Sequence, residues 1–209
     1  MSVILAIANR NAGVVGSDSR RVESDGAVHD GFDKTFALTS PPIIGGYVGL
    51  LEFSGKTVPV HIAEVLSDLT DQPTLAKVAK IIGDGLRDRL LAVQPDEVAH
   101  KHRKLELILV GPRTAVRSLP EIRVVVLKPA GQAITVSHES PAPYARGGDD
   151  DACRAIDSLL RRSESKVQTL DRSALADLAR RAVTAGIEHC GNHPYHKQLK
   201  ACGGKVNIR

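Results

Sequence analysis

Four polar residues near the start of the chain have the types needed to activate a nucleophile: Ser2, Asp18, Arg20 and Lys34. A serine hydroxyl attacks a carbonyl group only when a nearby base accepts its proton. If Met1 is removed, Ser2 acquires a free α-amine whose ordinary pKa of about 7.7–8.0 suits a general base. A charged Lys34 beside Ser2 would lower that pKa and favour the serine alkoxide. Asp18 would keep the lysine charged, and Arg20 would brace the Asp18 carboxylate.

Strands have to bring these residues together. The alternating apolar stretch at the start of the chain predicts two strands, at residues 2–8 and 14–18, joined by a turn at residues 9–13. Two further strands are predicted at 34–38 and 43–48. Pairing among them would place Lys34 beside Ser2.

The remaining sequence alternates between strand and helix periodicity. Helical apolar stripes are predicted within residues 62–69, 75–90, 152–160 and 175–182, and strands at 105–110, 122–127 and 134–137. Strands, two helices, strands and two helices in one chain are explained by two sheets packed face to face with helices outside. We therefore predict a single domain over residues 1–209.

The residue types and their order resemble those of the proteasome β-subunit and its bacterial relative, the HslV peptidase. The resemblance implies an α+β fold built as a four-layer αββα sandwich. It also implies an N-terminal-nucleophile hydrolase that cleaves peptide bonds inside a ring-shaped homo-oligomer of six or seven subunits per ring, with rings stacked face to face. Such an assembly would take its substrates from an ATP-dependent unfoldase.

The same resemblance implies further roles. Gly49 would donate its backbone N–H to an oxyanion, and Glu188 would supply an acid after the fourth helix. A specificity pocket would be lined by Arg21, Phe32 and Phe36. The family requires no cofactor, although its peptidase branch implies a sodium or potassium ion near residues 188–192.

Two departures from the family leave other functions open. Serine replaces the usual threonine nucleophile, and the turn before the third helix reads Gly147-Gly148-Asp149 instead of carrying a serine. Asp149 would cap that helix, whereas an Asp149 facing Ser2 would raise the amine pKa and keep the base protonated. A catalytically silent assembly subunit and a small-molecule amidase are therefore the alternatives.

Composition limits the partners and the compartment. The net charge of +4 resides in a basic tail, residues 193–209, which is a candidate for contact between subunits. With no Trp, three Phe and three Tyr, the chain offers few platforms for stacking nucleic-acid bases. No apolar run reaches the roughly 20 residues of a membrane helix, and no signal segment is evident, so we expect a cytoplasmic protein that binds no membrane.

The three cysteines do not form a CxxC pair, which argues against a disulfide framework. A zinc site is an alternative use of the same segment. Its ligands would come from His189, Cys190, His193, His196 and Cys202, although their spacing does not match a paired-ligand finger.

Overall fold

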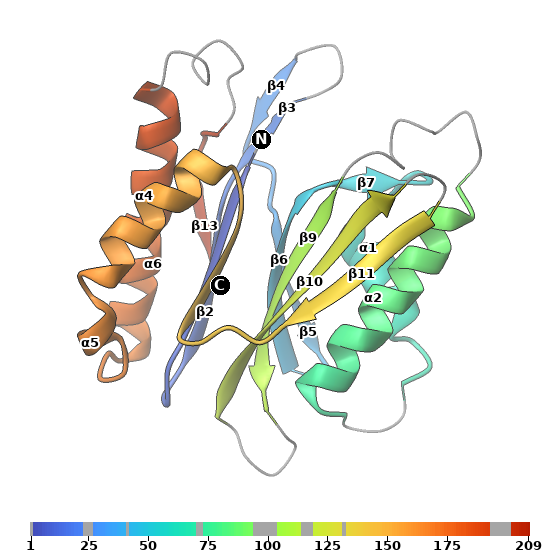
Figure 1. Cartoon of the computed structure of the whole chain (residues 1–209), viewed down its shortest axis with the longest axis horizontal. Coiled ribbons are helices and arrows are strands. Elements are labelled where there is room, and N and C mark those ends of the chain that lie inside the picture. Colours follow the sequence, from blue (N-terminus) through green and yellow to red (C-terminus); the bar gives the residue numbers. More distant parts are fainter. Residues whose placement is uncertain are drawn as a thin grey trace.

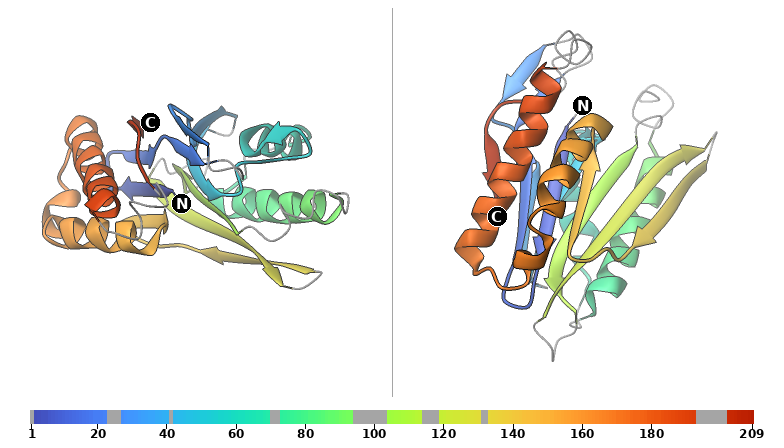
Figure 2. Two further views of the ribbon diagram at one scale, coloured as in Figure 1. Left: turned by 90° about the horizontal axis from the view of Figure 1, so that it is seen from above. Right: turned by 60° about the vertical axis from the view of Figure 1, so that its left-hand side comes forward.

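Two antiparallel sheets lie face to face, and each carries helices on its outer surface (Figures 1 and 2). The computed structural model describes residues 2–22, 27–40, 42–69, 73–93, 104–113, 119–130, 133–192 and 202–209. The view from above in Figure 2 separates the four layers. The predicted α+β, αββα sandwich is therefore confirmed.

The first sheet has the strand order β12-β1-β2-β13 and holds the start of the chain. Its strands are β1 (Val3–Ala8), β2 (Gly13–Asp18), β12 (Tyr144–Gly148) and β13 (Val206–Ile208). Every residue of β1 is buried, because one of its faces meets helices and the other meets the second sheet. That double burial explains its continuous apolar sequence.

The second sheet has the order β11-β10-β9-β6-β5. Its strands are β5 (Thr35–Thr39), β6 (Pro42–Gly49), β9 (Leu105–Pro112), β10 (Pro120–Ala130) and β11 (Ala133–Glu139). Two hairpins accompany it: β3 (Arg20–Val22) with β4 (Val28–Asp30), and β7 (Glu52–Phe53) with β8 (Lys56–Thr57).

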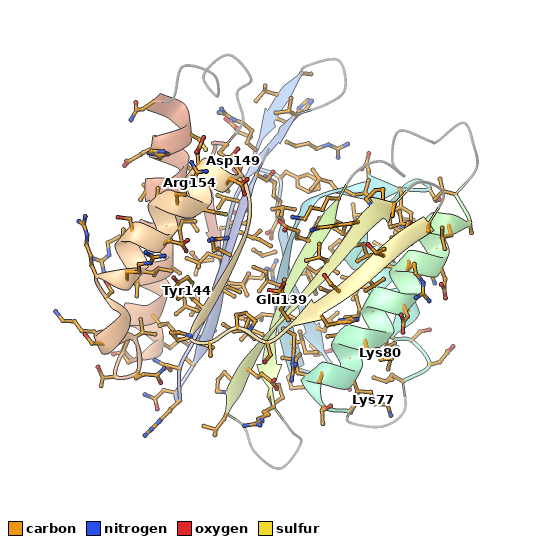
Figure 3. All side chains as sticks on the ribbon, viewed as in Figure 1. Lys77, Lys80, Glu139, Tyr144, Asp149 and Arg154 are labelled. Carbon is orange, nitrogen blue, oxygen red and sulfur yellow. The ribbon has the colours of Figure 1, made fainter. Side chains whose placement is uncertain are left out.

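Helices α1 (Val58–Val65) and α2 (Leu75–Leu91) cover the second sheet, while α4 (Asp150–Arg161), α5 (Glu164–Val167) and α6 (Arg172–Asn192) lie on the side of the first. The α1 helix begins earlier than its apolar stripe suggested, because Pro59 fits the first turn of a helix. Lys77 and Lys80 project from the outer side of α2 in Figure 3, opposite its buried stripe. None of these helices is long and apolar enough to cross a membrane.

Three apolar clusters fill the spaces between the four layers. One joins the second sheet to α1 and α2, one joins the first sheet to α4 and α6, and the third lies between the sheets. The third cluster includes Ile4, Val15, Ile108 and Val124. It holds the two sheets together and so fixes the start of β1 relative to β5.

The described part of the predicted basic tail belongs to the sandwich. Strand β13 pairs with β2, and the Arg209 guanidinium bonds to Asp33 at 2.8 Å and to the Thr35 hydroxyl at 2.8 Å. Residues 202–209 of the tail are therefore part of the fold of this chain, because their backbone groups complete the first sheet. Residues 193–201 lie outside the described residues.

Candidate active site

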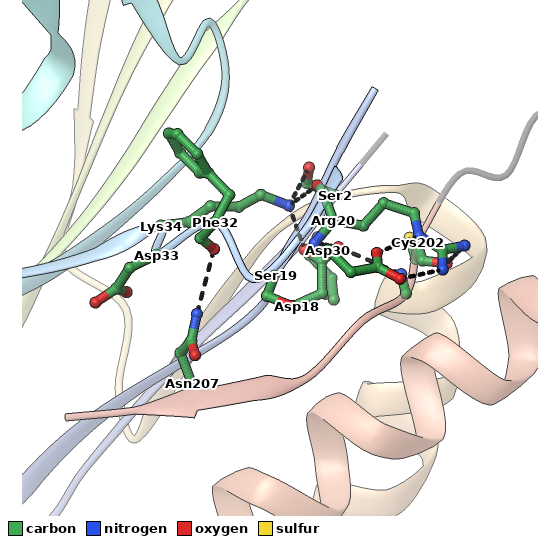
Figure 4. Close-up of polar contacts among 12 residues, drawn as sticks. Ser2, Asp18, Ser19, Arg20, Asp30, Phe32, Asp33, Lys34, Cys202 and Asn207 are labelled. Carbon is green, nitrogen blue, oxygen red and sulfur yellow. Dashed lines mark hydrogen bonds and ion pairs between the residues drawn. The ribbon is translucent and has the colours of Figure 1, made fainter. Parts of the chain in front are cut away.

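Lys34 connects the predicted residues at the start of β1 (Figure 4). Its ammonium group donates hydrogen bonds to the Ser2 hydroxyl at 2.7 Å, to the Asp18 carboxylate at 2.8 Å and to the Arg20 carbonyl oxygen. A lysine ammonium has three N–H donors and no acceptor, so these bonds use all of them. With all three N–H groups donated, the Lys34 nitrogen has no lone pair with which to accept the serine proton.

The Asp18 carboxylate is held on both of its oxygens. Oδ1 accepts from Lys34 and from the Val3 N–H at 2.9 Å, while Oδ2 accepts from the Arg20 N–H at 3.3 Å and the Gly203 N–H at 3.4 Å. The Asp18 and Lys34 side chains are both fully buried. Burial lowers the pKa of Lys34 below its ordinary value, and the nearby Asp18 charge opposes that shift without cancelling it.

The expected role of the Arg20 side chain is wrong in one respect. Its guanidinium binds Asp30 through two hydrogen bonds, at 2.8 and 2.9 Å, while only its backbone N–H reaches Asp18. The reason is the pairing of β3 with β4, which sets Arg20 directly opposite Asp30. The bond from Arg20 lowers the pKa of the Asp30 carboxyl. Nothing in the local sequence indicated Asp30, because only the hairpin register makes it a partner.

Gly49 ends β6 with a positive φ of 90°. Along this strand the Tyr47 N–H donates to the Lys34 carbonyl, whereas the Leu50 N–H donates to the Lys104 carbonyl of the opposite neighbour. Because N–H directions alternate along a strand, the Gly49 N–H points to the same edge as that of Tyr47. A Cβ atom at Gly49 would lie 1.8 Å from the Lys104 oxygen, so only glycine fits.

The turn from β12 into α4 contacts Ser2 directly. Gly148 has a φ of 109°, and the Asp149 N–H donates to the Ser2 carbonyl at 2.9 Å. The Asp149 carboxylate accepts from two N–H groups in the first turn of α4 and from the Cys190 thiol at 3.3 Å. Figure 3 shows Asp149 at this end of α4. The capping role predicted for Asp149 is therefore confirmed.

Glu188 does not reach this site. It is exposed on α6, whereas Cys190, only 1% exposed, is the residue of that turn which faces inward and bonds to Asp149. Glu188 falls outside the buried stripe of α6, which runs through Leu178, Ala182 and Val183. The expectation that Glu188 supplies an acid beside Ser2 is therefore wrong.

The metal predictions concern the same region. Residues 188–192 form the last turn of α6, and a sodium or potassium ion there stays a prediction. Of the proposed zinc ligands, His193 and His196 lie outside the described residues. Within the part of the chain that is described, no group of three or more His, Cys, Asp or Glu side chains could hold a metal ion.

Two of the three predicted pocket residues lie together. Arg21 forms two hydrogen bonds with Glu52, at 3.0 and 2.7 Å, and its guanidinium lies 5.4 Å from the centre of the Phe32 ring. Phe36 is separate from them and only 6% exposed, because it packs against Tyr47 in the core beneath α1 and α2. It cannot line a substrate pocket on the surface.

No protein-family model and no curated protein sequence matches this chain. Solved structures do match. Anbu from Hyphomicrobium sp. strain MC1 superposes with a TM-score of 0.65 at 14% identity, over 99% of this chain and 80% of that one. A Gly-1 mutant of the same protein gives 0.66 at 13% identity, over 100% and 80%. Anbu from Yersinia bercovieri, described as an ancestral beta-subunit, gives 0.63 at 14%, over 99% and 80%.

At these identities the likeness concerns the fold alone. It covers nearly the whole chain and includes both sheets and both helical layers. The fold of this chain is that of Anbu, a bacterial homologue of the proteasome β-subunit.

Proposed function

We propose that this chain is an N-terminal serine hydrolase that cleaves amide bonds in peptides after Met1 is removed. The observation that carries the proposal is the 2.7 Å hydrogen bond from Lys34 to the Ser2 hydroxyl, backed by the fully buried Asp18. A buried cation held against a hydroxyl oxygen stabilises the alkoxide form. Neither a surface lysine nor an ordinary strand end would need this arrangement.

The base in this mechanism is the α-amine of Ser2, because every N–H of Lys34 is already donated. The amine takes the Ser2 hydroxyl proton as the oxygen attacks the substrate carbonyl carbon. It then gives that proton to the departing amine, which leaves an acyl ester on Ser2. Water attacks the ester, passes a proton through the same amine and releases the acid.

Gly49 is our proposed oxyanion donor. Support comes from the direction of its N–H, which points to the edge of β6 nearest Lys34 and away from β9. An oxyanion donor of this kind contributes about 10²–10³ in rate. Only glycine fits the backbone conformation at this position. Glycine also suits a site where the substrate has to approach the backbone N–H closely.

The proposal extends to a ring-shaped homo-oligomer that works with an ATP-dependent unfoldase. It is supported by a fold shared with a protein described as an ancestral beta-subunit. Native mass spectrometry tests it, because a ring gives a single high multiple of the 22.3 kDa chain. A monomer at micromolar concentration would contradict it.

The intact mass of the purified protein, before and after a peptide epoxyketone, tests the chemistry. This probe closes a ring with both the hydroxyl and the free amine of an N-terminal nucleophile. We expect loss of Met1 and one adduct per chain, and no adduct with Ser2→Ala. Retained Met1 without an adduct would favour the silent assembly subunit. An adduct without peptide turnover, together with hydrolysis of simple acyl amides, would favour the amidase.

A further inference from the structure

Glu106 is a carboxylate placed between the two sheets. It lies on β9, on the same face as Ile108 and Val110, which belong to the apolar cluster between the sheets. Its side chain is only 15% exposed. A charged group in such a place has to be paired. Its partners are the Lys104 ammonium and the backbone N–H of Gly148, which donates to Oε2 at 2.8 Å.

Gly148, which is hydrogen-bonded to Glu106, lies directly against Ser2. A Cβ atom on Gly148 would lie 1.9 Å from the Ser2 carbonyl oxygen, so the backbones of these residues are in close contact. The next N–H in the chain, that of Asp149, holds the same Ser2 oxygen at 2.9 Å. Glu106 therefore holds the β12–α4 turn through the Gly148 N–H, and this turn holds the Ser2 carbonyl through the Asp149 N–H.

The start of β9 also supports the other glycine of the site. The Lys104 carbonyl accepts from the Leu50 N–H at 3.1 Å, immediately after Gly49. Gly49 and Gly148 belong to different sheets, and both have a positive φ. Lys104 and Glu106 thus tie together the two backbone turns between which Ser2 has to be aligned.

We propose that Glu106 is a positioning residue for Ser2, which acts by accepting the Gly148 N–H and holding the β12–α4 turn against the nucleophile. The inference rests on the proposed function. It assigns to Glu106 no contact with the substrate. Its carboxylate also occupies the space beside Gly147, where a Cβ atom would lie 2.9 Å from Oε2.

The test compares Glu106→Ala with Glu106→Gln, whose amide oxygen can still accept the Gly148 N–H. Glu121→Ala is the matched control, since Glu121 is also 15% exposed and ion-paired in the same sheet, but lies at the far end of β10. We measure the maximal rate and half-saturation of epoxyketone adduct formation, and kcat and KM for a peptide. Amide hydrogen exchange at Gly148 and Asp149 is followed in parallel.

For Glu106→Ala we expect a loss of about 10²-fold in maximal rate, with KM within about 2-fold, because the nucleophile is displaced while substrate binding is not. Glu106→Gln should retain most of the rate, and Glu121→Ala should match the wild type. Faster exchange at Gly148 is expected only in Glu106→Ala. If this variant does not fold, Glu106→Asp, which is one methylene shorter, replaces it.

Wild-type rates in Glu106→Ala would overturn the proposal. So would equal losses in Glu106→Ala and Glu106→Gln, or a loss of the same size in Glu121→Ala, since each would indicate a general structural effect. If the wild type forms no adduct, the proposed function fails instead. The exchange data then still decide whether Glu106 holds the turn, since unchanged protection at Gly148 contradicts it.

Discussion

The Lys34 ammonium and the Asp18 carboxylate lie 2.8 Å apart, and both side chains are fully buried. Each charge is costly to bury alone, and each is stabilised by the other and by the backbone groups around it. This pair contacts both the core of the fold and the proposed nucleophile Ser2, so stability and activity have to be measured separately in every variant of the site.

Breaking the buried pair on one side should be strongly destabilising. We expect Lys34→Met and Asp18→Asn each to lower the free energy of unfolding by about 3–5 kcal/mol, because each leaves an unpaired buried charge. The double variant should be less destabilised than the sum of the two, which urea unfolding measures as a coupling energy. Additive losses would mean that the two groups do not stabilise each other.

The pH dependence of activity should report Lys34. Its burial lowers its pKa, so the charged form that the mechanism needs is lost at a lower pH than the ordinary lysine value of about 10.4. We expect the rate of epoxyketone adduct formation to fall on the alkaline side at a pH below about 10.4. On the acid side the rate should fall as the Ser2 amine is protonated.

The contribution of Lys34 to the free energy of unfolding should rise over the same alkaline pH range in which the activity falls. Where the folded pKa lies below the unfolded one, the unfolded state binds more protons, so the contribution of Lys34 to the free energy of unfolding rises with pH. Urea unfolding of the wild type and of Lys34→Met isolates that contribution. If the protein unfolds over the same pH range in which its activity is lost, the assignment of that loss to Lys34 is contradicted.

Two glycines with nearly the same φ allow the effect of backbone strain to be separated from that of a steric clash with Ser2. Gly148 has a φ of 109° and Gly31 a φ of 106°, but a Cβ atom at Gly31 would meet nothing within 4 Å. We expect Gly31→Ala to cost about 1–2 kcal/mol of stability and to keep its activity. Gly148→Ala should lose about 10²-fold in maximal rate, because the new methyl group displaces the Ser2 carbonyl. Equal activities in the two variants would show that the contact with Ser2 is unimportant.

Much of the fold follows from local pattern. The strands β1, β2, β5, β6, β9, β10 and β11 and the helices α1, α2 and α4 lie within about four residues of where apolar periodicity predicted them, whereas α6 continues to Asn192, well past its predicted stripe. Short pieces were missed. The strands β12 and β13 and the β3–β4 hairpin carry too few residues for a periodic signal. Strands β12 and β13 form because β1 and β2, from a distant part of the sequence, satisfy their backbone groups, whereas β3 and β4 pair with each other.

The sequence likewise predicted the positions of some site residues and missed others. The spacing of Ser2, Asp18 and Lys34 predicted their meeting, because each lies in or beside a strand of predictable order. Glu106 gave no signal. An acid alternating with leucines normally indicates a solvent-facing side of a strand, whereas here that side is covered by the other sheet.

By itself, then, the sequence determined the sandwich class and the order of the residues around Ser2, because periodicity and spacing are local properties of the chain. Only the tertiary structure decided that Arg20 pairs with Asp30, that Glu188 faces away, and that Phe36 is core. It also decided that Glu106 holds the turn against Ser2. These outcomes depend on register and on the packing of one layer against another, which no short stretch of sequence encodes.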